Sequence, residues 1–91
     1  MKATAITSLS HFRAFPNPTS GTLHVRGKGN KEHAVQLRLF NALGALVTQQ
    51  QFPAGEVLIL TEMDLGQLTP GIYFLKIDSG PEMITKRIIK Q

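Results

Sequence analysis

The sequence predicts an all-β fold, an immunoglobulin-like antiparallel β-sandwich of about seven short strands. Apolar and polar residues alternate with period two in several segments, which is typical of strands with one buried face. Gly, Pro and Asn separate these segments at intervals of roughly 8 to 12 residues, the spacing expected of a sandwich. A helical stripe is almost absent. The chain has 91 residues, of which 42% are hydrophobic, and this suits one small folded domain.

The first half of the chain contains two clean alternating segments and a hairpin. Residues 22–26 and 35–39 place aliphatic side chains on one face and His, Gln or Arg on the other. Residues 41–44 form a turn, because their Asn can bond the backbone ahead and their Gly tolerates a positive φ. Residues 45–52 return as the partner strand, which Pro53-Ala54-Gly55 ends.

The second half contains the strongest strand signals. Residues 56–60 are continuously apolar after Glu56 and predict a strand covered on both faces. Residues 61–68 lack a helical stripe and contain a glycine, so they predict a strand end followed by a corner or a single turn. Residues 71–78 form the clearest strand, 79–81 a tight turn, and 82–90 an Ile-rich final strand.

The domain organisation is simple. Residues 1–11 lack periodicity and predict a linker or flexible N-terminal segment, and 12–91 form the sandwich domain. The first residues have no apolar stretch of the kind that a signal peptide needs, so an export signal for this domain would lie outside the chain. Its longest apolar runs, such as Ile72–Leu75, are far shorter than the roughly 20 residues of a membrane span.

The formal net charge is +4, with basic ends that flank a mildly acidic middle. Such ends could contact nucleic acid or anionic lipopolysaccharide. Aromatic residues are not interleaved with the cations as nucleic-acid binding favours. The sequence therefore favours a solvated basic surface and no nucleic-acid partner.

Residue types that could act in catalysis or bind a metal do not cluster in the sequence. There is no cysteine, which excludes a disulfide scaffold, a zinc ribbon and a redox thiol. His11, His24 and His33 lack the short spacings of paired metal ligands, and the carboxylates fall in no catalytic motif. A nucleophile elbow and a phosphate loop are also missing. We therefore predict no catalytic residue, no metal and no cofactor, and a binding or adaptor module in place of an enzyme.

Three local patterns are more informative. In the first, Pro16 and Pro18 fix φ while Asn17 and Gly21 supply turn geometry, which predicts a rigid corner before the strand at 22–26.

In the second, Gly71 allows a positive φ after Pro70, and Tyr73 buries its ring and sends its hydroxyl to a backbone group, as a corner tyrosine does. The third is the cationic terminal strand. Alternation places Lys86, Ile88 and Lys90 on one side, with Arg87 and Ile89 on the other.

The order of these patterns resembles the type A C-terminal sorting domain of the type IX (Por) secretion system. The resemblance rests on Phe-Pro-Asn-Pro-Thr-Ser-Gly at 15–21, Asn-Ala-Leu-Gly at 41–44, Leu-Thr-Pro-Gly-Ile-Tyr-Phe-Leu-Lys-Ile at 68–77 and Lys-Arg-Ile-Ile-Lys at 86–90. It covers about residues 14–91, nearly the whole chain. Each motif alone is weak, but four in this order are fairly specific.

The resemblance implies a non-catalytic secretion signal at the C-terminus of a larger cargo protein in Bacteroidetes. The cargo would cross the periplasm, and the type IX translocon would then take it through the outer membrane to the cell surface or the medium. A sortase-like surface peptidase would remove the domain before Phe15 and join the cargo to anionic lipopolysaccharide. The family motif residues would be Pro16, Asn17, Pro18, Gly21, Gly71 and Tyr73, and the recognition residues Lys86, Arg87, Ile88, Ile89 and Lys90.

Alternatives remain open for the motifs and for the function. The turn residues can be purely fold-forming, and Tyr73 purely core. The terminal strand can add to a partner's sheet edge, or pair with a second copy in a homodimer. The chain can instead be a carbohydrate- or protein-binding module appended to a secreted enzyme, or a structural adhesin module. If the terminal strand is the signal, we expect deletion of 86–91 to abolish export while the domain stays folded.

Overall fold

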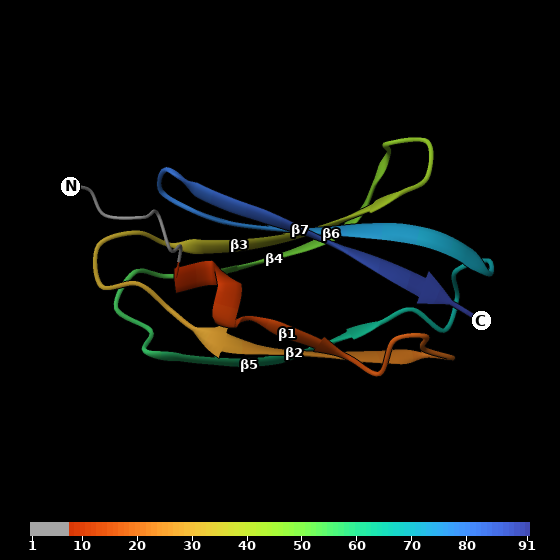
Figure 1. Ribbon diagram of the computed structural model, residues 1–91, viewed down its shortest axis with the longest axis horizontal. Helices are drawn as coiled ribbons and strands as arrows, with labels where there is room; N and C mark the ends of the chain where they lie inside the picture. Colours follow the sequence, from red (N-terminus) through yellow and green to blue (C-terminus); the bar gives the residue numbers. More distant parts are fainter. Residues whose placement is uncertain (1–7) are drawn as a thin grey trace.

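The computed structural model describes residues 8–91, which form two antiparallel sheets packed face to face (Figure 1). The three-stranded sheet has the order β1 (Arg13–Phe15), β2 (Thr22–Lys28), β5 (Leu58–Asp64). The four-stranded sheet has the order β4 (Leu46–Phe52), β3 (Val35–Asn41), β6 (Gly71–Ser79), β7 (Glu82–Lys90). A short 3-10 helix, η1 (Ser8–His11), precedes β1.

The predicted all-β sandwich of seven antiparallel strands is confirmed. The chain crosses from one sheet to the other after β2, after β4 and again after β5. In a constant-type immunoglobulin domain the fourth strand pairs with the fifth. Here β4 pairs with β3 as a hairpin, so the second sheet gains a strand and the first loses one.

Period-two alternation explains the core. In β2, β3 and β6 every second side chain is buried between the sheets, and the residues between them face outward. The buried side chains form one apolar cluster: Leu9, Phe12, Leu23, Val25, Val35, Leu37, Leu39, Ile59, Met63, Leu65, Tyr73, Leu75, Ile77 and Ile88.

The fifth strand differs from its prediction. It runs from Leu58 to Asp64, and the expectation that 56–60 is covered on both faces is wrong. Ile59 is buried, but Leu58 and Leu60 are 55% and 62% exposed. The reason is that β5 is an edge strand of a sheet whose outer face is uncovered, and a short apolar run cannot by itself distinguish this from full burial.

The start of the described chain packs onto the sandwich. The 3-10 helix places Leu9 in the core, and the buried Phe12 ring covers Gly27, where a Cβ would overlap that ring. The packed part of the chain therefore includes Ser8–His11, which the sequence assigned to a linker. Residues 1–7 of that linker lie outside the described residues.

Two predicted turns take the expected form. Asn41 Oδ1 accepts hydrogen bonds from the backbone N–H groups of Leu43 (3.0 Å) and Ala45 (2.9 Å), and Gly44 has φ 88°. The tight turn between β6 and β7 likewise contains a glycine at positive φ, Gly80.

Candidate recognition surface

The last strand, β7, lies at an edge of the four-stranded sheet and pairs with β6 along its whole length, from Glu82 opposite Ser79 to Lys90 opposite Gly71. An edge strand exposes a row of backbone N–H and C=O groups that another strand can bind. The groups of this domain that already bind these N–H and C=O groups therefore decide which part of β7 another molecule can contact.

Asn17 binds the outer edge of β7 with both ends of its side-chain amide. Its Nδ2 donates to the carbonyl oxygen of Arg87 at 2.8 Å, and its Oδ1 accepts from the backbone N–H of Ile89 at 2.9 Å. An amide carries one donor and one acceptor group, so it satisfies a strand edge as a neighbouring backbone would. The two partners are 70 and 72 residues away in sequence.

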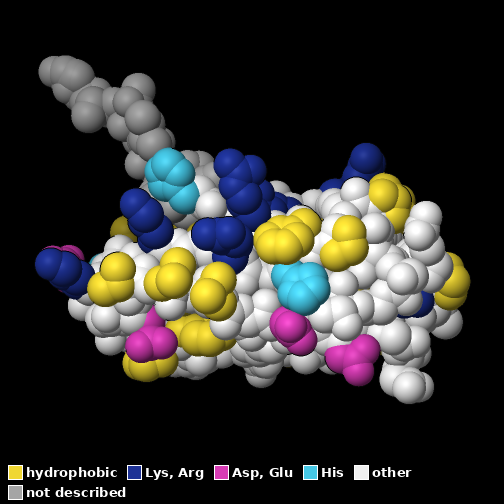
Figure 2. All heavy atoms as spheres, turned by 90° about the horizontal axis from the view of Figure 1, so that it is seen from below, with side chains coloured by type: hydrophobic (Ala, Val, Ile, Leu, Met, Phe, Trp, Pro, Cys, Tyr) yellow, Lys and Arg dark blue, Asp and Glu magenta, His cyan; other side chains and the backbone are white. Residues whose placement is uncertain are grey.

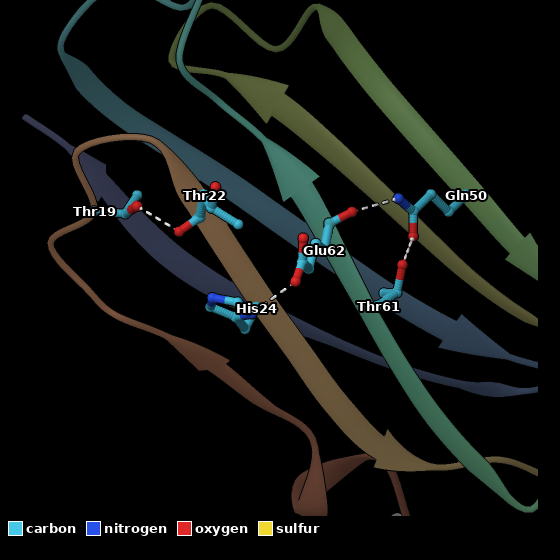
Figure 3. Close-up of polar contacts among 6 residues, drawn as sticks. All are labelled: Thr19, Thr22, His24, Gln50, Thr61 and Glu62. Atoms are coloured by element: carbon cyan, nitrogen blue, oxygen red, sulfur yellow. Dashed lines mark hydrogen bonds and ion pairs between the residues drawn. The ribbon is translucent and has the colours of Figure 1, made fainter.

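Thr19 adds backbone hydrogen bonds to the same edge of β7. We call the contacts of Asn17 and Thr19 with β7 the brace. The Thr19 N–H donates to Ile89 O at 2.8 Å, and the Thr19 carbonyl accepts from Gln91 N–H at 2.8 Å, forming a parallel bridge with Lys90. The buried Thr19 hydroxyl donates to Thr22 O at 2.9 Å (Figure 3). The N-terminal corner and the terminal strand are thus one structural unit.

The corner contains two cis peptide bonds, at Phe15-Pro16 and Asn17-Pro18. Gly21 does not adopt a positive φ, and a Cβ there would meet no atom within 4 Å. Its role lies in its backbone, whose N–H donates to Thr19 Oγ1 at 3.2 Å and whose carbonyl accepts from Leu65 N–H at 2.9 Å.

The motif at the start of β6 builds a tyrosine corner. Gly71 has φ 153°, which favours glycine, and the buried Tyr73 donates its hydroxyl proton to Thr69 O at 2.6 Å. The hydrogen bond predicted for Tyr73 is therefore present. It fixes the crossover from β5 to β6, which is a role in the fold.

The five residues of the terminal strand that were predicted to recognise the machinery differ in accessibility. Ile88 is 0% exposed and belongs to the core, and Lys90 is 7% exposed, with its Nζ donating to Gln91 O at 2.8 Å. Arg87 is exposed, and Lys86 and Ile89 are half-buried. The predicted alternation is correct, but the segment is not displayed as a whole.

The outward residues of β7 join a larger surface on the four-stranded sheet. Cα pairing places Arg87 beside Phe74 and Ile89 beside Ile72, and Phe74 lies beside Phe40 of β3. We call this surface the terminal face; it consists of Phe40, Ile72, Phe74, Lys76, Arg87 and Ile89.

Cations surround an apolar centre on the terminal face. Lys76 Nζ and Arg38 Cζ lie 5.4 and 5.9 Å from the centroid of the Phe40 ring, within the range of cation–π attraction. Arg38 is also paired with Asp78 at 3.4 Å, whereas Arg87 forms no ion pair within residues 8–91. An apolar centre with a charged rim is the arrangement found in protein–protein interfaces.

Among residues 8–91, no group of three or more His, Asp or Glu side chains is placed to hold a metal ion. In the same part of the chain, no helix has the length and apolar character that a membrane crossing requires. Phe15 is the one aromatic side chain among the large exposed hydrophobic residues of the described part of the chain.

The fold and this face define a class of protein: an immunoglobulin-like sandwich with a partly apolar, cationic outer face. The sequence matches the family model described as the secretion system C-terminal sorting domain over residues 13–91, from the first residue of β1 onward. The chain belongs to this family, the C-terminal sorting domains of type IX secretion. A comparison with curated proteins finds no match.

The family assignment confirms the resemblance and supports part of the predicted function. A sorting domain of this kind implies a cargo N-terminal to it, the type IX machinery as partner, and secretion through the outer membrane. The family is not a catalytic one, which fits the absence of a catalytic motif in the sequence.

Sequence reasoning missed the long-range roles of Asn17 and Thr19. It treated Asn17 as a turn residue, and it included Thr19 only as part of the motif at 15–21. The one local hint is that the two prolines around Asn17 remove backbone donors, which leaves its side chain to bond elsewhere.

Proposed function

We propose that the type IX machinery recognises this domain through the outward residues of β7, with Arg87 and Ile89 at the centre of the contact. The observation that carries the proposal is the brace of Asn17 and Thr19 on β7. By occupying the backbone edge, the brace holds Arg87 and Ile89 on the terminal face, where their side chains remain available.

This geometry favours recognition by side chains over addition of a strand. A partner strand, or a second copy in a homodimer, would have to displace Asn17 and Thr19 from the edge between Arg87 and Gln91. A homodimer through β7 would therefore use the part of the strand before Arg87, where Met83 is exposed.

We further propose that a sortase-like surface peptidase removes the domain after passage through the periplasm and the outer membrane, and joins the cargo to anionic lipopolysaccharide. Peptidases cleave exposed extended segments more readily than packed ones. Because Leu9 and Phe12 are buried in the core, we place the cleavage before Leu9.

A reporter that carries a signal peptide and residues 8–91, expressed in a bacterium with type IX secretion, tests the contact. We expect Arg87→Glu combined with Ile89→Ser to lower surface and medium reporter at least about tenfold, leaving it in the periplasm. Lys31→Glu is the matched control, because it reverses an exposed charge away from the terminal face and should export normally.

Thermal unfolding of the purified variants separates recognition from folding. Both changes alter exposed or half-buried side chains, so stability should shift by no more than about 1 kcal/mol. Normal export of the folded Arg87/Ile89 double variant would contradict the proposed contact. Deletion of 86–91 is a poorer test than the sequence suggested, because it removes Ile88 from the core and the partner of Gly71–Leu75.

A further inference from the structure

The outer face of the three-stranded sheet forms a second surface, on the opposite side of the sandwich from the terminal face. Figure 2 shows hydrophobic side chains beside Lys and Arg on this side of the molecule. Cα pairing places Arg13 beside Arg26, Arg26 beside Leu60, and Lys28 beside Leu58. We call this surface the basic–apolar face; it consists of Arg13, Phe15, Arg26, Lys28, Leu58 and Leu60.

The apolar side chains of the basic–apolar face are exposed to solvent. Leu58 and Leu60 are more than half exposed, and Phe15 is 43% exposed with its ring stacked on His24 at a centroid distance of 5.5 Å. Phe15, Leu60 and Glu62 line an open hollow of about 490 Å³. Neighbouring exposed apolar side chains on one face, bordered by polar ones, mark interaction sites in soluble proteins.

Its charges are unbalanced. Arg13 and Arg26 lie directly opposite each other across the β1–β2 pair, and like charges in this position destabilise a sheet. Within residues 8–91, no carboxylate pairs with Arg13, Arg26 or Lys28. Glu62, on the same sheet, is engaged with His24 at 3.5 Å (Figure 3). Carboxylates from another molecule would relieve the repulsion between the two arginines.

We propose that the basic–apolar face docks onto a protein surface that has carboxylates around an apolar centre. The exposed aliphatic side chains suit a protein partner, because interfaces bury apolar side chains at their centre and complement charge around it. A uniformly anionic lipid surface suits the face less well, since Glu62 and Asp64 lie on the same side of the sheet as Leu58 and Leu60. This docking is separate from the sorting contact and does not rest on it.

Site-specific photocrosslinking in secreting cells tests the docking. The photoreactive residue p-benzoylphenylalanine replaces Leu60 in the reporter fusion, and Thr48, which is exposed on the other sheet, serves as the matched control position. We expect a discrete adduct from position 60 only, with a crosslinked partner peptide that mass spectrometry shows to contain Asp or Glu. Arg26→Glu should reduce this adduct at least tenfold, and Arg26→Lys should retain it.

Reversing the charge of the partner residue completes the experiment. Changing the identified partner carboxylate to Lys should restore crosslinking to the Arg26→Glu variant. Four results would overturn the proposal: no adduct, an adduct to lipid or lipopolysaccharide, an adduct containing only a second copy of this chain, or a protein adduct insensitive to Arg26→Glu. Reporter location is scored in the same cells, so export without an adduct overturns the docking alone. The sorting contact is tested separately by the Arg87/Ile89 double variant.

Discussion

At the two lateral edges of the sandwich, different kinds of contact join one sheet to the other. On one side, Asn17 and Thr19 bind the backbone of β7, and the neighbouring Ile88 is buried in the core. On the other side, Gln50 of β4 reaches across to β5, where its Nε2 donates to Glu62 O at 2.9 Å and its Oε1 accepts from the Thr61 hydroxyl at 2.7 Å (Figure 3). The side that joins the two motif segments thus combines backbone hydrogen bonds with buried apolar contact, while on the other side a polar side chain, Gln50, makes the hydrogen bonds from β4 to β5.

The largest effect should come from Ile88 of β7. Ile88→Ala removes a fully buried side chain and leaves a cavity, so we expect the free energy of unfolding to fall by about 2–5 kcal/mol in urea titrations. Ile89→Ala deletes the same atoms from the outward side of the strand and should cost less than half as much. Equal losses for the two variants would mean that β7 is not anchored through Ile88.

A smaller effect should come from the brace. Asn17→Ala removes two hydrogen bonds in an exposed setting where water replaces part of them, so we expect a loss of about 1–2 kcal/mol. Hydrogen exchange should show faster exchange of the Ile89 amide. Gly21→Ala is the control in the same corner, because the added Cβ has room and the φ is ordinary, and it should change stability by less than about 0.5 kcal/mol.

The smallest effect should come from the opposite side. Gln50→Ala leaves the backbone pairing of β4 intact and exposes Glu62 O and Thr61 Oγ1 to water, so we expect a loss of about 0.5–1 kcal/mol. Gln51→Ala, at an exposed neighbouring position, should be close to neutral. If Gln50→Ala lowers the free energy of unfolding in urea by more than Asn17→Ala does, the contrast between the two sides is wrong.

Local pattern predicts most of this fold. The alternation in 22–26, 35–39 and 71–78 gives both the strands and their buried faces, because a single inward set of aliphatic residues determines the register. The Asn41 turn and the Tyr73 corner were also predicted, since each depends on residues within a few positions.

What local pattern does not predict depends on partners far away in the sequence. Strand β1 has three residues, too few for a visible alternation, and it exists because it pairs with β2. The exposure of Leu58 and Leu60 follows from the absence of a covering layer, which their own sequence does not encode. The bonds of Asn17 join positions about 70 residues apart, so no window around Asn17 contains them.

The attachment of Asn17 to Arg87 and Ile89 also has a consequence for the timing of biosynthesis. The N-terminal corner cannot close until the ribosome has released the residues that follow Lys86, since its hydrogen-bonding partners do not exist before then. A prematurely terminated polypeptide would lack both the corner and the outward Arg87 side chain. The sorting contact that we propose therefore forms only after translation has passed Ile89.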